Sequence, residues 1–132
     1  MGTNEEYDSP DAEVLKGNIE NTKEFIRISQ GIGGSGVKPN GFHEDVPREK
    51  TIEQIGKSLN NLVDYAADYG QIIRLEVHGK ETEELPVIKA IMDHITSPNV
   101  RVCWNCNDTD LKGEGLENNF NLMKNRKMVS RR

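Results

Sequence analysis

Two apolar stretches of this sequence end in side chains that could bind a metal ion or carry out acid–base chemistry. The first stretch, QIIRLEVHG, contains Glu76 and His78, and the second, NVRVCWNCNDTD, runs into Asn105, Asn107 and Asp108. Oxygen and imidazole ligands of this kind suit a divalent cation such as Mn²⁺, Mg²⁺, Co²⁺ or Zn²⁺. A carboxylate such as Glu76 can also serve as a general acid or base.

The spacing of apolar residues in the rest of the chain predicts the elements that position these side chains. Helices and strands alternate at intervals of roughly thirty residues, which indicates an α/β protein with a parallel sheet and helices packed outside it. In such proteins ligands bind at the carboxyl ends of the strands. The predicted order is helix 11–30, strand 36–40, helix 47–69, strand 71–79, helix 85–95, a strand beginning at 99, loop 107–115 and a helix after it.

Alternation along the strands decides which side chains share a face. Ile73, Leu75 and Val77 would face the helices together with Val102 and Trp104. Buried polar groups without partners cost about 1 to 3 kcal/mol each, so polar residues converging on the opposite face need a reason. That inward face would carry Arg74, Glu76, His78, Cys103, Asn105 and Asn107.

Two interpretations of this polar face remain open. One is an ion pair between Arg74 and Glu76 in a wet barrel mouth, and the other is a metal or substrate site. His78 alone fits a supporting or structural role better than that of a ligand. The first strand exit, at Pro39-Asn40-Gly41, is polar like the other two, so Asn40 is a further candidate for contact with a substrate.

The pair Cys103 and Cys106 has the C-x-x-C spacing of zinc and redox motifs. A zinc site needs about four ligands, and no second pair completes this one. A redox pair normally lies where a strand turns into a helix, whereas both cysteines fall inside a predicted strand and point to opposite faces. We therefore interpret them as small strand residues.

Composition limits the partners and the cellular location. The 132 residues suit one domain, and 22 acidic against 17 basic residues give a formal net charge of −5, which argues against a nucleic-acid partner. No apolar run approaches the roughly 20 residues of a membrane-spanning helix, and the acidic start lacks the core of a signal peptide, so we expect a cytoplasmic protein without a membrane partner.

Three segments together resemble the sugar phosphate isomerase/epimerase family, whose fold is the xylose isomerase-like TIM barrel. They are GIGGSGVKPNG, IGKSLNNLVDYAADYGQIIRLEVHG and IMDHITSPNVRVCWNCNDTDLKGEGLENNFNLMKNR. The pairing of L-E-V-H-G before one helix with C-W-N-C-N-x-T-D one unit later is the specific part of the resemblance. It covers residues 11–126, and we expect residues 1–10 to be a disordered segment and residues 127–132 to be a basic tail.

The resemblance implies a metal-dependent enzyme that moves a proton next to a carbonyl through an enediolate. A Glu at the end of one strand and an Asp or Asn at the end of the next bind the metal in that family, together with a His and a second Glu from later strands. Glu76 matches the first Glu, as ligand and catalytic group, and Asn105 matches the next ligand. Asp108 falls among the neighbouring ligands, and His78, Asn107 and Asn40 fall where a sugar or sugar phosphate would lie.

The sequence departs from the family pattern after Asp108, because the later His and Glu have no counterpart. We therefore expect an incomplete barrel of three to four parallel strands with little or no activity as this chain alone. Open sheet edges of this kind predict self-association. Two alternatives remain: a non-catalytic fragment or binding module of the same fold, and an apurinic-endonuclease-like DNA repair enzyme.

Overall fold

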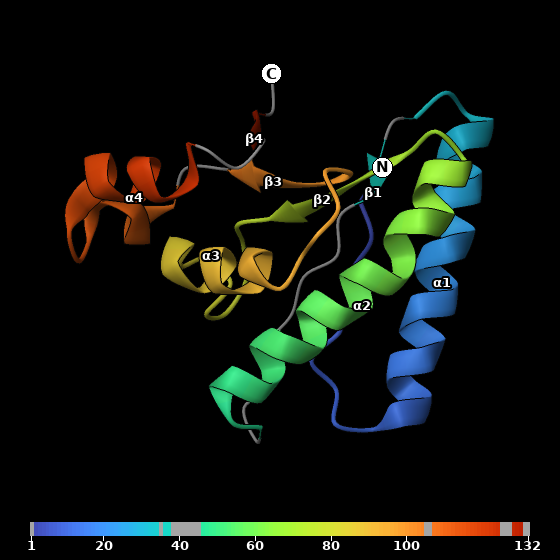
Figure 1. Ribbon diagram of the computed structural model, residues 1–132, viewed down its shortest axis with the longest axis horizontal. Helices are drawn as coiled ribbons and strands as arrows, with labels where there is room; N and C mark the ends of the chain where they lie inside the picture. Colours follow the sequence, from blue (N-terminus) through green and yellow to red (C-terminus); the bar gives the residue numbers. More distant parts are fainter. Residues whose placement is uncertain (1, 35, 38–45, 105–106, 125–127, 131–132) are drawn as a thin grey trace.

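The computed structural model describes residues 2–34, 36–37, 46–104, 107–124 and 128–130. Helices and strands alternate along these residues (Figure 1). Their order is α1 (Ala12–Gly31), β1 (Gly36–Val37), α2 (Arg48–Asp68), β2 (Ile72–Glu76), α3 (Leu85–Asp93), β3 (Val100–Trp104), the 3₁₀ turn η1 (Asp108–Leu111), α4 (Gly115–Met123) and β4 (Met128–Ser130). The predicted α/β class is confirmed.

The four strands form one sheet in the order β1-β2-β3-β4, and every neighbouring pair is parallel. Each strand therefore lies beside the strand that precedes or follows it in the chain. α1 packs beside β1, α2 beside β2, and α3 contacts both α2 and α4. In Figure 1, α1 lies at one end of the row of helices and α4 at the other. This is the arrangement of a partial barrel, as the sequence predicts.

Short-range signals explain where the helices begin and end. The carboxylate of Asp11 accepts hydrogen bonds from the backbone N–H groups of Glu13 and Val14, which caps the start of α1. Pro47 precedes α2 directly, and Pro86 lies in the first turn of α3, where its missing N–H costs nothing. Gly70 follows α2 with a φ of 63°, the left-handed conformation that glycine adopts readily.

The core lies between the sheet and the helices. Ile73 pairs in register with Val100 and Leu75 with Val102, and all four side chains are buried. They join buried residues of α2 and α3 in one cluster. The predicted helix-facing side of β2 and β3 is thus confirmed, and Arg74, Glu76, Arg101 and Cys103 lie on the opposite face.

α2 and α3 approach each other closely at Gly56. A Cβ atom at this position would lie 2.5 Å from the Cβ of His94, the residue that ends α3. Asn60, one turn further along α2, donates a hydrogen bond from Nδ2 to the carbonyl oxygen of His94 at 2.7 Å. Glycine at position 56 is therefore what allows the two helices to pack at this distance.

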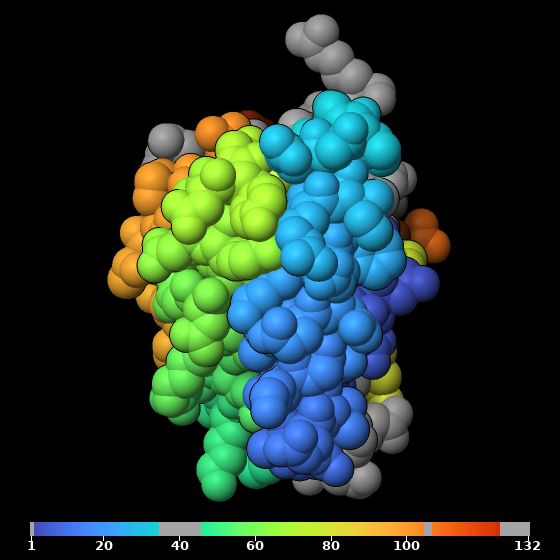
Figure 2. Space-filling model, turned by 90° about the vertical axis from the view of Figure 1, so that its right-hand side faces the viewer, coloured from blue at the N-terminus to red at the C-terminus, as the bar shows by residue number. Residues whose placement is uncertain are grey.

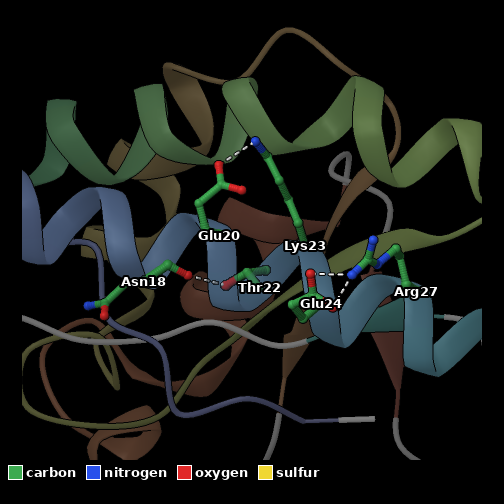
Figure 3. Close-up of polar contacts among 6 residues, drawn as sticks. All are labelled: Asn18, Glu20, Thr22, Lys23, Glu24 and Arg27. Carbon is green, nitrogen blue, oxygen red and sulfur yellow. Dashed lines mark hydrogen bonds and ion pairs between the residues drawn. The ribbon is translucent and has the colours of Figure 1, made fainter.

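α1 lies alongside α2 on the surface (Figure 2) and carries ion pairs along its outer side (Figure 3). Lys23 pairs with Glu20 at 2.7 Å, and Arg27 pairs with Glu24. The Lys23 ammonium group also lies 5.7 Å from the centre of the Tyr65 ring of α2. Exposed pairs of this kind add little stability and mainly keep this face solvated.

The N-terminal segment differs from the prediction of a disordered residue range 1–10. Tyr7 is 1% exposed, and its hydroxyl lies 2.6 Å from Oγ1 of Thr22 in α1. Gln54 of α2 donates hydrogen bonds from Nε2 to the carbonyl oxygens of Tyr7 and Ser9, at 2.8 Å each. These long-range contacts hold an acidic segment that has no helical or strand periodicity of its own.

The C-terminal part also differs from the prediction. Met128–Ser130, expected to belong to a basic tail, forms β4 and pairs in parallel with β3, in register from Val102 opposite Met128. The polar loop 107–115 contains the turn η1. β1 is assigned at Gly36–Val37 only, and residues 38–40 of the predicted first strand lie outside the described residues.

Candidate functional site

The carboxyl ends of β2 and β3 lie side by side. Glu76 pairs in register with Cys103, and the N–H of Val77 donates to the carbonyl oxygen of Cys103 at 3.0 Å. Beyond the sheet, Asn107 donates from Nδ2 to the carbonyl oxygen of Val77 at 2.9 Å. The structure thus brings together the two strand exits that the sequence marks as polar.

Glu76 is a buried carboxylate at the exit of β2. It is the last residue of β2, its side chain points to the face opposite the helices, and it is 2% exposed. Arg74 and Arg101 lie two residues before Glu76 and Cys103 on the same face. A buried carboxylate at the end of a parallel strand, with cationic groups below it, is the usual position of a catalytic or ligand-binding group in this architecture.

Asp110 organises the exit of β3 and is not among the candidate residues from the sequence. Its Oδ2 accepts hydrogen bonds from the backbone N–H of Asn107 at 2.8 Å and from the Trp104 indole N–H at 3.0 Å. Asn119 of α4 donates to the Asp110 carbonyl oxygen at 3.0 Å. The side chain is 4% exposed, and Oδ1 makes no hydrogen bond among the described residues.

The signal that could have identified Asp110 is the spacing N-D-T-D. Asn107 and Asp110 form a capping box, in which residues three apart satisfy each other's backbone N–H groups at the start of a helical turn. This pattern predicts a short helical turn directly after β3. The turn positions Asn107 and Asp108 at the strand exit, but it does not indicate a catalytic or binding role for either residue.

The loop between β2 and α3 borders the same region. Thr82 donates from Oγ1 to the carbonyl oxygen of His78 at 2.5 Å, and Glu81 has a φ of 60°. Arg48, at the start of α2, contacts Glu81 at 3.5 Å and Glu84 at 3.0 Å. The loop is therefore held from two sides, although a residue other than glycine in the left-handed region costs of order 1 kcal/mol or more.

The candidate residues from the sequence fall into three groups. Glu76 is buried at the end of β2, and Asn107 is half-buried with its amide bound to Val77. The side chains of His78 and Asp108 are exposed at the strand exits. Asn40 and Asn105 lie outside the described residues. Cys106 lies outside them as well, whereas Cys103 is a buried free thiol.

The described part of the chain does not by itself form a metal site. No three His, Cys, Asp or Glu side chains within it come together in a way that could hold a metal ion. Glu76 has the buried carboxylate oxygens that a divalent cation prefers. At least part of a ligand set would have to come from residues beyond those described.

A separate pocket lies on the helix layer, between the start of α3 and α4. Its volume is about 680 Å³, and its mainly apolar lining includes Leu85, Pro86 and Leu122 together with Lys112, Asn118 and Asn121. None of the candidate residues from the sequence lines it.

Among the described residues, no helix is long and apolar enough to cross a membrane.

Parallel strands with outer helices, and a buried acidic residue at a strand exit, define the class of α/β barrel proteins that bind ligands at the carboxyl ends of their strands. The chain belongs to the xylose isomerase-like TIM barrel family, whose pattern matches residues 3–129. Comparison with curated proteins finds no significant match.

Solved structures of the same fold are similar to this chain at low sequence identity. D-Psicose 3-epimerase from Clostridium cellulolyticum H10, solved with D-tagatose, is 12% identical with a TM-score of 0.75, and the match covers 92% of this chain and 47% of that chain. D-Allulose 3-epimerase from Methylomonas sp. is 18% identical with a TM-score of 0.70, covering 92% and 46%. A xylose isomerase domain protein from Planctomyces limnophilus is 14% identical with a TM-score of 0.68, covering 89% and 42%. The chain therefore spans less than half the length of these structures.

Proposed function

We propose that this chain carries part of the active site of a metal-dependent sugar or sugar phosphate isomerase or epimerase. The observation that carries the proposal is the buried Glu76 carboxylate at the end of β2, beside the exit of β3, in a chain of the xylose isomerase-like family. Sugar epimerases with the same fold were solved with D-fructose and with D-tagatose, which supports a sugar as the substrate. The proposed reaction is an aldose–ketose isomerisation or an epimerisation.

In this proposal Glu76 has two roles. Its carboxylate is a ligand of the metal, together with Asn105 and Asp108, and it accepts or returns the proton next to the sugar carbonyl. When bound, the divalent cation (Mn²⁺, Mg²⁺, Co²⁺ or Zn²⁺) polarises oxygens of the substrate as a Lewis acid. His78, Asn107 and Asn40 would contact the sugar from the three strand exits. The burial of Glu76 supports its role, because water is kept away from the transferred proton.

We propose that the 132-residue chain alone has little or no turnover. The sequence contains no histidine after His94, so it has no counterpart of the family's histidine ligand from a later strand. A site with fewer ligands binds a metal ion more weakly and leaves its substrate less well oriented. The free thiol of Cys103 is compatible with the reducing cytoplasm, where we propose that the protein is located.

The test is calorimetric titration of Mn²⁺ into the complete chain and into Glu76→Gln. The substitution removes the charge and keeps the shape of the side chain. Glu117→Gln, an exposed residue of α4, is the matched control. We expect the chain and the control to bind Mn²⁺, and Glu76→Gln to lose binding. Equal binding by all three would contradict the proposed role of Glu76. Robust conversion of D-fructose or D-tagatose by the purified chain would refute the proposed lack of turnover.

We also propose that copies of this chain associate with one another. The large exposed apolar side chains of the described residues lie on α1 and its end or on η1 and α4, the two ends of the row of helices, and none lies on α2 or α3. Examples are Ile28 and Ile32 at one end and Leu116 and Phe120 at the other, between 46% and 71% exposed. Apolar side chains gathered beside sheet edges favour association.

A further inference from the structure

α1, at one end of the row of helices, carries an apolar stripe on the side turned away from α2. Successive residues of a helix are about 100° apart around its axis, so Val14, Ile28 and Ile32 fall within about 40° of one another. All three side chains are exposed. Lys23, which lies over the Tyr65 ring of α2, is on the opposite side of α1 (Figure 3). These three residues, the α1 stripe, therefore point along the helix layer and away from α2.

α4 shows the same arrangement at the other end of the row. Asn118 and Leu122 line the pocket between α3 and α4, which places them on the α3 side of α4. The same geometry puts Leu116 and Phe120, both exposed, on the side away from α3. We name these two residues the α4 stripe. Each end of the row thus presents the apolar contact that a further helix of the layer would make.

The sheet ends in the same way on both sides. Among the described residues, β1 pairs with β2 alone and β4 with β3 alone, and all these pairs are parallel. A TIM barrel closes with eight parallel strands, and a strand spacing of about 4.8 Å with a tilt of about 36° gives a ring about 15 Å across. The four strands described here make half of such a ring.

We propose that two copies of this chain close one eight-stranded barrel around a twofold axis that runs parallel to the strands. This axis keeps all eight strands parallel, places β4 of each copy beside β1 of the other, and brings the α4 stripe of each copy against the α1 stripe of the other. Both sheet edges of both copies are then paired, so the assembly stops at two chains. This inference rests on the association proposed above and specifies its geometry.

The distribution of charge favours contact between opposite edges. Residues 2–13, which lead into α1, contain five acidic residues and no basic ones, whereas residues 124–132, which include β4, contain five basic residues and no acidic ones. Contact between two like edges would bring like charges together, and contact between opposite edges brings unlike charges together. The two edges of one chain therefore complement each other, which makes a second copy the fitting occupant of each edge.

In this ring the second copy completes the mouth that holds Glu76. Arg74, Glu76, Arg101 and Cys103 are the residues of β2 and β3 on the inner face, so these strands of one copy supply one carboxylate. The Glu76 residues of the two copies would lie four strands apart, on opposite sides of a ring about 15 Å across, with a small molecule between them. Two carboxylates on either side of a bound sugar could act as general acid and general base.

The experiment measures molar mass by light scattering for the 132-residue chain and for Ile28→Lys and Phe120→Glu. We expect the unaltered chain to form a discrete dimer, with twice the chain mass of 14.9 kDa, and each variant to be monomeric, because each puts a charge into both apolar contacts of the ring. Asn61→Lys, an exposed position of α2, is the control and should leave the dimer intact. Circular dichroism equal to that of the unaltered chain shows that the variants fold.

Mixing the two variants tests which edges meet. In the ring, the mixed dimer has one contact between unaltered Ile28 and Phe120 and one contact between the two oppositely charged replacements. We therefore expect mixing to restore the dimer. A contact between like edges would leave one of the two variants dimeric by itself. That result, a monomeric unaltered chain, or a series of species larger than the dimer would overturn the inference.

The mixed dimer also tests whether the two copies share one mouth. Mn²⁺ is titrated calorimetrically into the mixed dimer with Glu76→Gln added to one of the two variants only. In a shared mouth we expect the affinity for Mn²⁺ to fall at least about tenfold throughout the sample. Two independent sites would keep half of the binding capacity at unaltered affinity, which would overturn the shared mouth.

The two proposals fail in different ways. If mixing restores the dimer while Glu76→Gln in both copies leaves Mn²⁺ binding unchanged, the ring is right and the proposed metal role of Glu76 is wrong. If monomeric Ile28→Lys binds Mn²⁺ as tightly as the unaltered chain and loses this binding on Glu76→Gln, the proposed function survives and the shared mouth does not.

Discussion

Replacing Gly56 by alanine tests how closely α2 and α3 must pack. The added Cβ would lie 2.5 Å from the Cβ of His94 and 3.4 Å from the carbonyl oxygen of Ile91. Neither atom is the far end of a flexible side chain, so relief requires a movement of one helix against the other. Gly17 in α1 offers a matched control, because a Cβ there meets no atom within 4 Å.

The two substitutions should change stability in opposite directions. Alanine is favoured over glycine inside a helix by about 0.5 to 1 kcal/mol, so Gly17→Ala should raise the free energy of unfolding by about that amount. At Gly56 the same gain is opposed by overpacking, which typically costs about 1 to 3 kcal/mol. We therefore expect Gly56→Ala to lower the free energy of unfolding by up to about 2 kcal/mol.

Urea denaturation of the two variants and the unaltered chain, followed by circular dichroism, measures both values. Protein concentration is held constant, because association of the folded chain adds to its apparent stability. A stabilisation by Gly56→Ala equal to that of Gly17→Ala would refute the close approach of α2 to His94. Retention of the Mn²⁺ affinity by Gly56→Ala at low temperature would separate this packing effect from the strand exits.

Three further changes have defined outcomes. Tyr7→Phe removes the hydroxyl contact with Thr22 and should lower the free energy of unfolding, measured by urea denaturation, by about 1 kcal/mol. Burial raises the pKa of the Tyr7 phenol above its usual value of about 10. The contribution of Tyr7 to stability is therefore complete below about pH 10 and decreases as the pH rises further, and ultraviolet titration of the phenol can follow this change. Asp110→Asn weakens the acceptor of the Trp104 indole N–H and should shift the tryptophan emission while lowering stability by about 1 to 3 kcal/mol. Phe120→Asp should lower the average mass measured by light scattering if copies associate through α4, and an unchanged mass would exclude that surface.

Periodicity in the sequence was sufficient to predict the order of the elements. The helices of residues 11–30 and 47–69 carry continuous apolar faces and end at glycines, so local signals and packing agree. The assignment of Val102 to the helix-facing side followed from strict alternation, which a one-residue shift would have reversed. These predictions depend only on the periodicity of apolar residues in helices and their alternation in strands, which repeat over many residues.

The parts that the sequence did not predict depend on single long-range contacts. Tyr7 contacts Thr22 and Gln54, and the local sequence of this acidic segment contains no pattern that predicts these partners. β4 is three residues long, too short for alternation to be recognised, and exists through its pairing with β3. At the candidate site, alternation predicted the face on which Glu76 lies, whereas the role of Asp110 required the geometry of the turn after β3.

The order of the strands has a consequence for how this chain folds. Every strand pairs with its neighbour in the sequence, from β1 to β4, and helical structure lies between consecutive strands in the chain: α2, then α3, then η1 with α4. The entropic cost of loop closure is therefore that of one unit at a time, because no strand pairs with a strand that is distant in the sequence. Each unit can add to the sheet as it leaves the ribosome, with the preceding strand as a template already in place.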